Sequence, residues 1–181
     1  ARKNDGTAVA WGDENRGSNA DGNADLRNVA DISCADWACV ARKNDGTAVT
    51  WGPRPDYGGD ASVQGVDLTN VANISCVGSN GFARKNDGTA ESWGQIENRQ
   101  YASTLTNVAD ISCGGKACVA RKTDGTAVAW GSSDYGGDAS SVDLTNVADI
   151  SCGYGACVAR KTDGTAEAWG ASYAGGDSGT S

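Results

Sequence analysis

Short apolar segments alternate with turns rich in glycine and aspartate along the whole chain. In the stretch "NVADISCGGKACVARKTDGTAVAWG", Asn107–Gly131, strands are expected over 108–112, 118–122 and 126–130. A glycine-rich tip joins the first two strands, and the Asp-Gly pair favoured in tight hairpins joins the last two. No window places apolar residues at the i, i+3, i+4 and i+7 positions of a helix. Each such stretch is therefore predicted to be a three-stranded antiparallel meander, and the chain to be all-β.

The same pattern recurs along the chain. The phrase "ARK[NT]DGTAxxWG" starts at Ala1, Ala41, Ala83, Ala120 and Ala159. A second phrase, "L[RT]NVA[DN]ISC", recurs between these copies. A period near 40 residues is typical of propeller blades, whereas the coils of stacked β-helices are usually shorter. The propeller also explains why "TAVAW" lacks clean alternation, since both faces of the strand are covered.

We therefore expect one repeat domain over 1–181, a β-propeller of blades of about 38–40 residues. The repeat units are assigned to 1–40, 41–82, 83–119, 120–158 and 159–181, the last of them incomplete. Five partial repeats form either a small ring or an arc of a larger ring.

The cysteines follow the repeats. Three repeats carry a C-x-x-x-x-C pair, formed by Cys34 and Cys39, Cys113 and Cys118, and Cys152 and Cys157. A short tip between two strands places such residues opposite one another, as a disulfide requires. Structural zinc prefers C-x-x-C spacing and four ligands, so disulfides are favoured over a metal site. Disulfides imply an oxidising compartment and predict a secreted or cell-surface protein.

Cys76 stands opposite Gly81 and has lost its partner. A buried small hydrophobe is the favoured interpretation of Cys76, and a bond to another chain is the alternative.

Charge and composition argue against several classes of function. The chain has 15 basic and 23 acidic residues, no histidine and a net charge of −8. Without a basic cluster we expect no nucleic-acid partner. Without an apolar run of about 20 residues we expect no membrane insertion. Near-identical repeats without histidine offer no set of unlike groups for catalysis, so we predict no enzyme, no catalytic residue and no cofactor.

Oxygen ligands for a cation are too sparse in the Asp-Gly turns, so no metal is predicted there. The stretch "DENRGSNADGNAD", Asp13–Asp25, is denser in such ligands, and a solvated acidic loop is favoured over a cation site. Asn73 lies in an N-x-S glycosylation sequence, a match that often arises by chance.

The run "ISCGGKACVARKTDGTAVAWG", 111–131, resembles the blade repeat of the regulator of chromosome condensation family. The matching positions are Ile111, Gly114, Ala120, Asp124, Gly125, Trp130 and Gly131. The repeat length is similar to that of bacterial secreted members, which include a β-lactamase inhibitor protein. The resemblance implies a β-propeller, usually of seven blades. The family's frequent histidine falls on Ala117 and its second apolar strand residue on Arg121, so no binding residues are carried over.

Specificity is expected where the copies differ, at the tips between paired cysteines and in the loops after "WG". Exposed aromatic and basic side chains at such places are typical of binding surfaces, although blade packing is the alternative for the tyrosines. The candidates are Trp37, Lys116 and Tyr154 on the tips, and Arg54, Tyr57, Tyr101, Tyr135 and Tyr173 on the loops. We predict a non-catalytic extracellular module that binds a protein or glycan. The alternative is a self-assembling structural subunit of a filament, coat or appendage.

Overall fold

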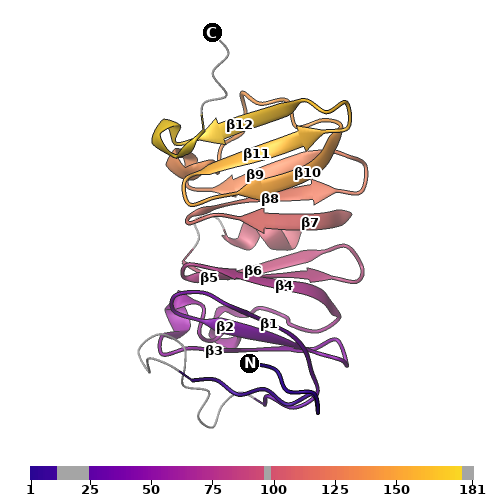
Figure 1. The fold of residues 1–181 in the computed structure, drawn as a ribbon, viewed down its shortest axis with the longest axis vertical. Coiled ribbons are helices and arrows are strands. Elements are labelled where there is room, and N and C mark those ends of the chain that lie inside the picture. Colours follow the sequence, from indigo (N-terminus) through magenta and orange to yellow (C-terminus); the bar gives the residue numbers. More distant parts are fainter. Residues whose placement is uncertain (12–24, 96–98, 177–181) are drawn as a thin grey trace. The chain divides into compact units, whose positions relative to one another are not determined.

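The computed structural model describes residues 1–11, 25–95 and 99–176. These residues form four three-stranded antiparallel sheets joined by loops with short 3-10 helices (Figure 1). The all-β, blade-type fold predicted from the repeats is confirmed. The chain divides into two compact units, Ala1–Gln95 and Ile96–Ser181, which are described one at a time. The assignment of all five repeats to one domain stays a prediction.

The first unit contains two complete blades. Their strands are β1 (Val29–Cys34), β2 (Cys39–Lys43), β3 (Ala48–Trp51), β4 (Val71–Val77), β5 (Asn80–Lys85) and β6 (Ala90–Gly94). The 3-10 helices η2 (Pro55–Tyr57) and η3 (Ser62–Gln64) lie in the loop between the blades. Before the first blade, residues 1–11 form a partial hairpin with a bridge between Arg2 and Ala8.

The second unit contains two blades of the same kind. Its elements are η4 (Arg99–Thr104), β7 (Val108–Cys113), β8 (Ala117–Lys122), β9 (Ala127–Gly131), η5 (Ser133–Tyr135), β10 (Val147–Cys152), β11 (Ala156–Lys161), β12 (Ala166–Gly170) and η6 (Ser172–Ala174). The predicted strands agree with β7, β8 and β9 to within about one residue. The loops after "WG" hold short 3-10 turns.

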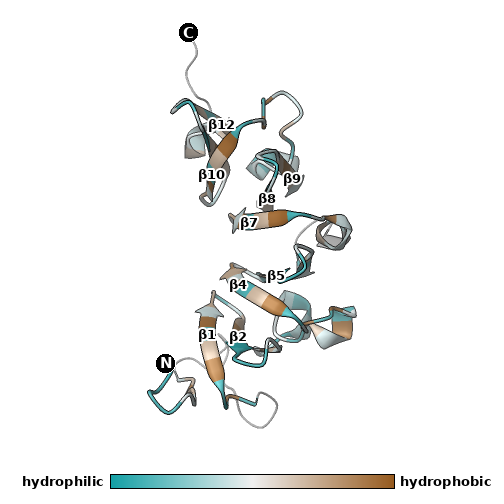
Figure 2. Ribbon diagram, turned by 90° about the vertical axis from the view of Figure 1, so that its right-hand side faces the viewer, coloured by the Kyte–Doolittle hydropathy of each residue, from teal (hydrophilic) through white to brown (hydrophobic). Residues whose placement is uncertain are grey.

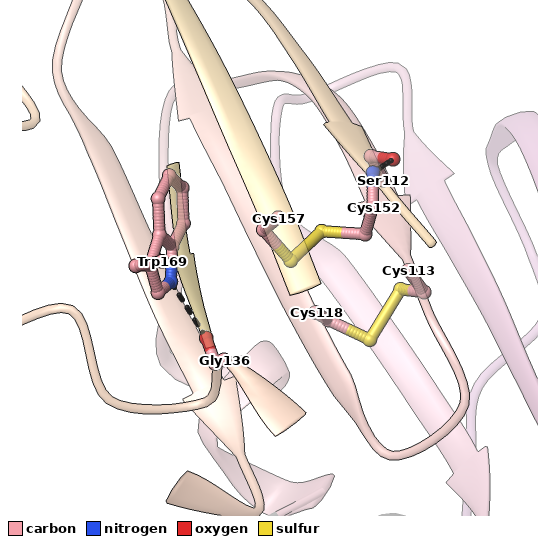
Figure 3. Close-up of a disulfide and its surroundings, with 7 residues drawn as sticks. All are labelled: Ser112, Cys113, Cys118, Gly136, Cys152, Cys157 and Trp169. Atoms are coloured by element: carbon pink, nitrogen blue, oxygen red, sulfur yellow. Dashed lines mark hydrogen bonds between the residues drawn. A yellow bond between two sulfur atoms is a disulfide. The ribbon is translucent and has the colours of Figure 1, made fainter. Parts of the chain in front are cut away.

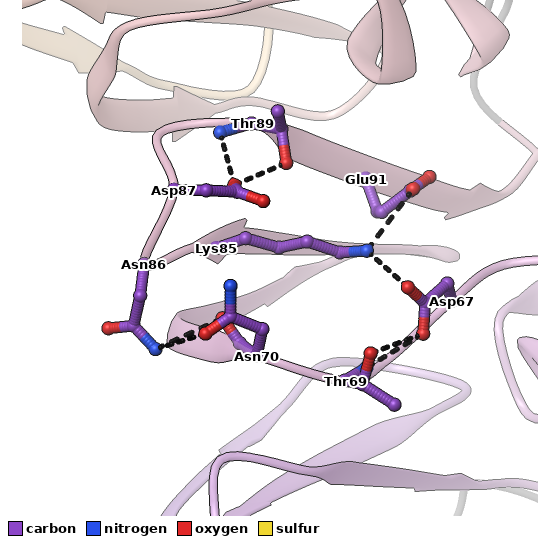
Figure 4. Close-up of polar contacts among 8 residues, drawn as sticks. All are labelled: Asp67, Thr69, Asn70, Lys85, Asn86, Asp87, Thr89 and Glu91. Carbon is purple, nitrogen blue, oxygen red and sulfur yellow. Dashed lines mark hydrogen bonds and ion pairs between the residues drawn. The ribbon is translucent and has the colours of Figure 1, made fainter.

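The Asp-Gly hairpins are closed by their own side chains. In the β5–β6 turn, Asp87 Oδ1 accepts hydrogen bonds from Thr89 N at 2.9 Å and Thr89 Oγ1 at 2.7 Å (Figure 4). Gly88 has φ of +81°, a left-handed conformation that suits glycine. Asn70, just before β4, is also left-handed with φ of +57°, and its backbone and side-chain oxygens accept hydrogen bonds from Asn86 Nδ2. The D-G-T sequence thus closes the turn between the second and third strands. The asparagine of the N-V sequence ties the start of the first strand to that turn.

A buried valine begins the first strand of every blade. Val29, Val71, Val108 and Val147 are no more than 1% exposed. Figure 2 shows brown, hydrophobic segments within β1, β4 and β7. Because apolar area removed from water is the main favourable term in folding, these strands carry much of a core that is poor in large aliphatic side chains.

Consecutive blades are joined by repeated hydrogen bonds. Ser112 Oγ on β7 accepts from Cys152 N on β10 at 2.9 Å, and the Trp169 indole N–H donates to Gly136 O at 2.9 Å (Figure 3). In the first unit Trp93 donates to Gly58 O at 3.2 Å in the same way. In both units a tryptophan of one blade is therefore bonded to the loop that precedes that blade.

In three blades an arginine of the second strand pairs with an aspartate of the first strand. Arg42 contacts Asp31, Arg121 contacts Asp110, and Arg160 Nη2 lies 3.9 Å from Asp149 Oδ2. The aspartates are more than half exposed, so each pair contributes little to stability.

Candidate functional site

Disulfides close the three cysteine hairpins. Bonds link Cys34 to Cys39, Cys113 to Cys118 and Cys152 to Cys157, and in each pair the Cα atoms are 4.1 Å apart. The next residues toward the tip share a backbone hydrogen bond, such as Gly153 N to Ala156 O at 2.8 Å. Each cysteine pair therefore occupies a non-hydrogen-bonded position, where facing residues approach closest. The disulfide fixes the tip beyond it.

Cys76 lies in the interior of the first unit. It packs in one cluster with Val40, Val71 and Trp93, and burial raises the pKa of its thiol to about 12. A Cβ atom built on Gly81, the residue opposite, would lie 2.1 Å from Cε2 of Trp93. The indole thus fills the space that a second cysteine would need. Burial supports the interpretation of Cys76 as a small hydrophobe and not as a link to another chain.

Three predicted residues meet at the tip end of the first blade. The Trp37 and Tyr57 rings lie 5.8 Å apart between centroids, and the Arg54 guanidinium carbon lies 5.0 Å from the Tyr57 centroid. Arg54 is exposed, whereas both rings are half-buried. A cation over a tyrosine face is attracted by the ring quadrupole. We call Trp37, Arg54 and Tyr57 the Trp37 cluster.

Four predicted residues meet at the tip end of the second unit. The Lys116 ammonium lies 5.0 Å from the Tyr135 centroid, and the Tyr135 ring meets the Tyr154 ring edge-on with centroids 5.8 Å apart. Desolvation and the neighbouring Tyr135 raise the pKa of the Tyr173 phenol. Tyr154 is 71% and Tyr173 77% exposed. We call Lys116, Tyr135, Tyr154 and Tyr173 the Tyr154 cluster.

Tyr101 lies outside both clusters. Its ring is 6.3 Å from that of Trp130, a tryptophan that is 3% exposed. Tyr101 therefore packs against the blade formed by β7, β8 and β9, which matches the blade-packing alternative considered for the loop tyrosines.

Glycines that the sequence did not single out shape the Tyr154 cluster. Gly115 N donates a hydrogen bond to Tyr154 O at 3.1 Å, and a Cβ on Gly115 would lie 3.0 Å from Cδ2 of the Tyr154 ring. A Cβ on Gly155 would lie 3.6 Å from the Tyr173 hydroxyl. The signal in the sequence was the glycine content of the tips, "GGKA" and "GYGA". The sequence does not reveal what these glycines do, because their role depends on the Gly115 and Tyr154 tips lying side by side.

Metal binding, glycosylation and membrane insertion were also considered from the sequence. Among residues 1–11, 25–95 and 99–176, no group of three or more acidic, cysteine or histidine residues is placed to hold a metal ion. The acidic stretch Asp13–Asp25 lies, except for Asp25, outside the described residues. Asn73 of the N-x-S sequence is exposed on β4. In the part of the chain that the structure describes, none of the helices has the length and apolar character needed to cross a membrane.

Known proteins share this fold. The family model for the regulator of chromosome condensation (RCC1) repeat matches residues 108–136. No curated protein matches the sequence. Among solved structures, Prp20p from Saccharomyces cerevisiae is 14% identical with a TM-score of 0.60, covering 78% of this chain and 44% of its own. The ectodomain of the Physcomitrella patens receptor kinase CR4 is 16% identical with a TM-score of 0.61, and the match covers 92% of this chain and 44% of the CR4 ectodomain. Human WBSCR16 is 20% identical with a TM-score of 0.55, covering 78% and 47%.

The chain spans less than half the length of each of these structures. At such identities the likeness concerns the fold, and the sequence match adds the repeat type. Residues 108–136 match the repeat of the regulator of chromosome condensation type, and the chain shares the blade fold of the propeller structures that it resembles.

Proposed function

We propose that this protein is a non-catalytic interaction module that binds a protein or glycan outside the cell through the tip ends of its blades. The observation that carries the proposal is the Tyr154 cluster. It joins Lys116 and the largely exposed Tyr154, on tips that differ from repeat to repeat, to the largely exposed Tyr173 on a loop. Large aromatic and cationic side chains dominate the energetics of most binding surfaces.

The disulfides support this role because they hold the tips in one conformation. Cys113–Cys118 and Cys152–Cys157 close the two hairpins that carry Lys116 and Tyr154. A tip that is already ordered loses less conformational entropy on binding, and tyrosine itself has few rotatable bonds. Three disulfides also fit an extracellular location.

Proteins of the same fold favour a binding role. The structure of Prp20p is described with its binding to Gsp1p and histones, and a second structure shows Kap60 bound to yeast RCC1. The CR4 structure is the ectodomain of a receptor kinase. We transfer from these only the general role, a surface for a macromolecular partner. A protein partner and a glycan remain the two classes to compare.

The test screens the disulfide-intact protein against an array of soluble glycans and a displayed library of extracellular proteins. For each binder found, affinity is then measured for the parent, Tyr154→Ala, Tyr173→Ala, Trp37→Ala and the control Tyr101→Ala. We expect Tyr154→Ala, Tyr173→Ala and Trp37→Ala to weaken binding by about tenfold or more, and Tyr101→Ala to leave it unchanged.

Parent-like affinity in all folded cluster variants would refute the assignment of the site. If the parent forms large particles in sedimentation, and the variants bind normally but form none, the structural-subunit alternative is favoured instead.

A further inference from the structure

One aspartate satisfies three donors just before the first strand of the second blade. Asp67 Oδ1 accepts hydrogen bonds from Thr69 N at 3.0 Å and from Thr69 Oγ1 at 2.8 Å, and its Oδ2 accepts from Lys85 Nζ at 2.6 Å (Figure 4). The Lys85 side chain is 10% exposed, so a nearby carboxylate is needed to neutralise its ammonium. The two oxygens of one carboxylate are thus divided between a threonine and a lysine.

The fourth blade repeats this arrangement. Asp143 Oδ1 accepts from Thr145 N at 3.1 Å and from Thr145 Oγ1 at 2.7 Å, and its Oδ2 accepts from Lys161 Nζ. In the first blade Asp25 Oδ2 accepts from Lys43 Nζ at 2.7 Å. Three blades therefore hold a carboxylate of the chain at the same place.

The third blade keeps the donors and lacks the carboxylate. Thr104 stands where the other three blades have aspartate, while Lys122 and Thr106 keep the places of the lysine and the threonine. The Thr104 hydroxyl donates to Tyr101 O at 2.7 Å, within η4. Among the described residues, the Lys122 ammonium and the N–H and hydroxyl of Thr106 have no hydrogen-bond or ion-pair partner.

The backbone around these donors has the same conformation as in the other blades. Asn107, which follows Thr106, is left-handed with φ of +57°, as its counterpart in the second blade is. Thr123 N donates to Asn107 O at 2.8 Å, a bond that also recurs. Lys122 pairs with Val108 in the register of the other blades. Lys122 and Thr106 are thus placed as their counterparts are.

In the part of the chain that the structure describes, no other carboxylate replaces the missing aspartate. The glutamate that lies 3.7 Å from Lys85 Nζ in the second blade is replaced by Val128 in the third. Asp124 of the adjacent turn accepts from Thr126 N at 2.9 Å and Thr126 Oγ1 at 2.7 Å, as the turn aspartates of the other blades do. Lys122 is partly buried, and an ammonium removed from water without a counter-charge is unfavourable. An anion bound at this place would therefore be stabilised.

We propose that Lys122 and Thr106 form a binding site for the carboxylate of a ligand, with one oxygen on the lysine ammonium and the other on the threonine N–H and hydroxyl. The inference goes beyond the proposed function, which uses the blade tips. Lys122 ends β8, whereas Lys116 of the Tyr154 cluster precedes the first residue of that strand.

The chain itself indicates the class of ligand. A planar group with two oxygens occupies the equivalent place in the second and fourth blades. A net charge of −8 disfavours anions of higher charge, such as sulfate or phosphate. The carboxylate can belong to a small acid or to a peptide, and the test separates these two sources.

The test is an NMR titration of the isotope-labelled, disulfide-intact protein with acetate at neutral pH, with chloride replaced so that ionic strength is constant. We expect the amide of Thr106 to shift with saturation. The amides of Thr69 and Thr145 are internal controls and should not respond, because an aspartate of the chain already bonds to each.

Three variants make the result specific. Lys122→Gln should raise the half-saturating acetate concentration by about tenfold or more, since a charge-assisted bond is lost. Thr104→Asp restores the carboxylate found in the other blades and should abolish the acetate response. Lys3→Gln, which removes an exposed lysine of residues 1–11, should leave the response unchanged.

Two blocked peptides identify the source of the carboxylate. One is Gly-Asp-Gly with both ends capped, and the other is triglycine with a capped amino end and a free carboxyl end. Tighter binding of either peptide than of acetate assigns the site to a peptide carboxylate, and equal affinities assign it to small acids. The proposal is overturned if the Thr106 amide shows no saturable shift, if all three threonine amides shift alike, if the response persists in Thr104→Asp, or if sulfate binds more tightly than acetate.

Discussion

The substitution Gly81→Cys tests how the second blade is packed. It restores the cysteine that the other three complete blades carry, directly opposite Cys76 on the paired strands. The register would allow a disulfide, but the space is taken: the Cβ of residue 81 would lie 2.1 Å from Trp93 Cε2, far below van der Waals contact. Trp93 cannot swing outward easily, because it is 0% exposed and its indole N–H is bonded to Gly58 O.

The disulfide and the overpacking change the free energy of unfolding in opposite directions. A bridge closing so short a loop stabilises the folded state by about 2 kcal/mol in the chain-entropy account. Overpacking a filled core destabilises it by about 1–3 kcal/mol. We therefore expect oxidised Gly81→Cys to be no more stable than the parent. Reduced Gly81→Cys should be less stable than the parent by about 1–3 kcal/mol.

The assay is urea unfolding followed by tryptophan fluorescence, with thiols counted in denaturant to establish whether the bond has formed. Gly81→Ala is the matched control, since it adds the same Cβ without a thiol and should lose as much stability as the selectively reduced Gly81→Cys. If the oxidised variant gains the full 2 kcal/mol or so, or if Gly81→Ala matches the parent, the reasoning from Trp93 is refuted.

Three further results are expected. Trp169→Phe should lower the free energy of unfolding by about 1 kcal/mol more than Trp130→Phe does. The reason is that the Trp169 indole N–H donates to a carbonyl, whereas the buried Trp130 Nε1 has no partner among the described residues. Equal losses would contradict this. Lys85 and Thr69 lower the pKa of Asp67 to about 2, so its contribution to stability should be present above about pH 4 and lost toward pH 2, and acid unfolding of Asp67→Asn should show a weaker pH dependence in that range. Cys76 should resist iodoacetamide at pH 8 in the folded protein and react in urea, as followed by mass spectrometry; rapid labelling of the folded form would contradict its burial and raised pKa.

Sequence reasoning located the hairpins because their signals are local. Residues of the strand, turn and strand contact neighbours only a few positions away, so the alternation of apolar and turn residues is enough. Cys152 and Cys157 face each other for the same reason. The left-handed asparagine before each first strand was missed, since asparagine in "LTNVA" also fits an ordinary loop.

The candidate site was only partly accessible from the sequence. The residue types were chosen from their variability between repeats, but nothing local indicates that Tyr135, on a loop after β9, meets Tyr154, on the tip of the next blade. Tyr101 has the same type of position in the sequence and packs on Trp130 instead. The loop before β7 differs in sequence from the others, so the repeat pattern could not place it.

By itself the sequence determined the repeat, the three-stranded blade and the disulfide hairpins, because each depends on contacts within one unit of the pattern. The tertiary structure decided which of the candidate binding residues share a surface and why Gly81 excludes a fourth bridge. These features depend on how one blade packs against the next. That packing is set by side-chain volume and hydrogen-bond direction across positions about 40 residues apart, which no local pattern records.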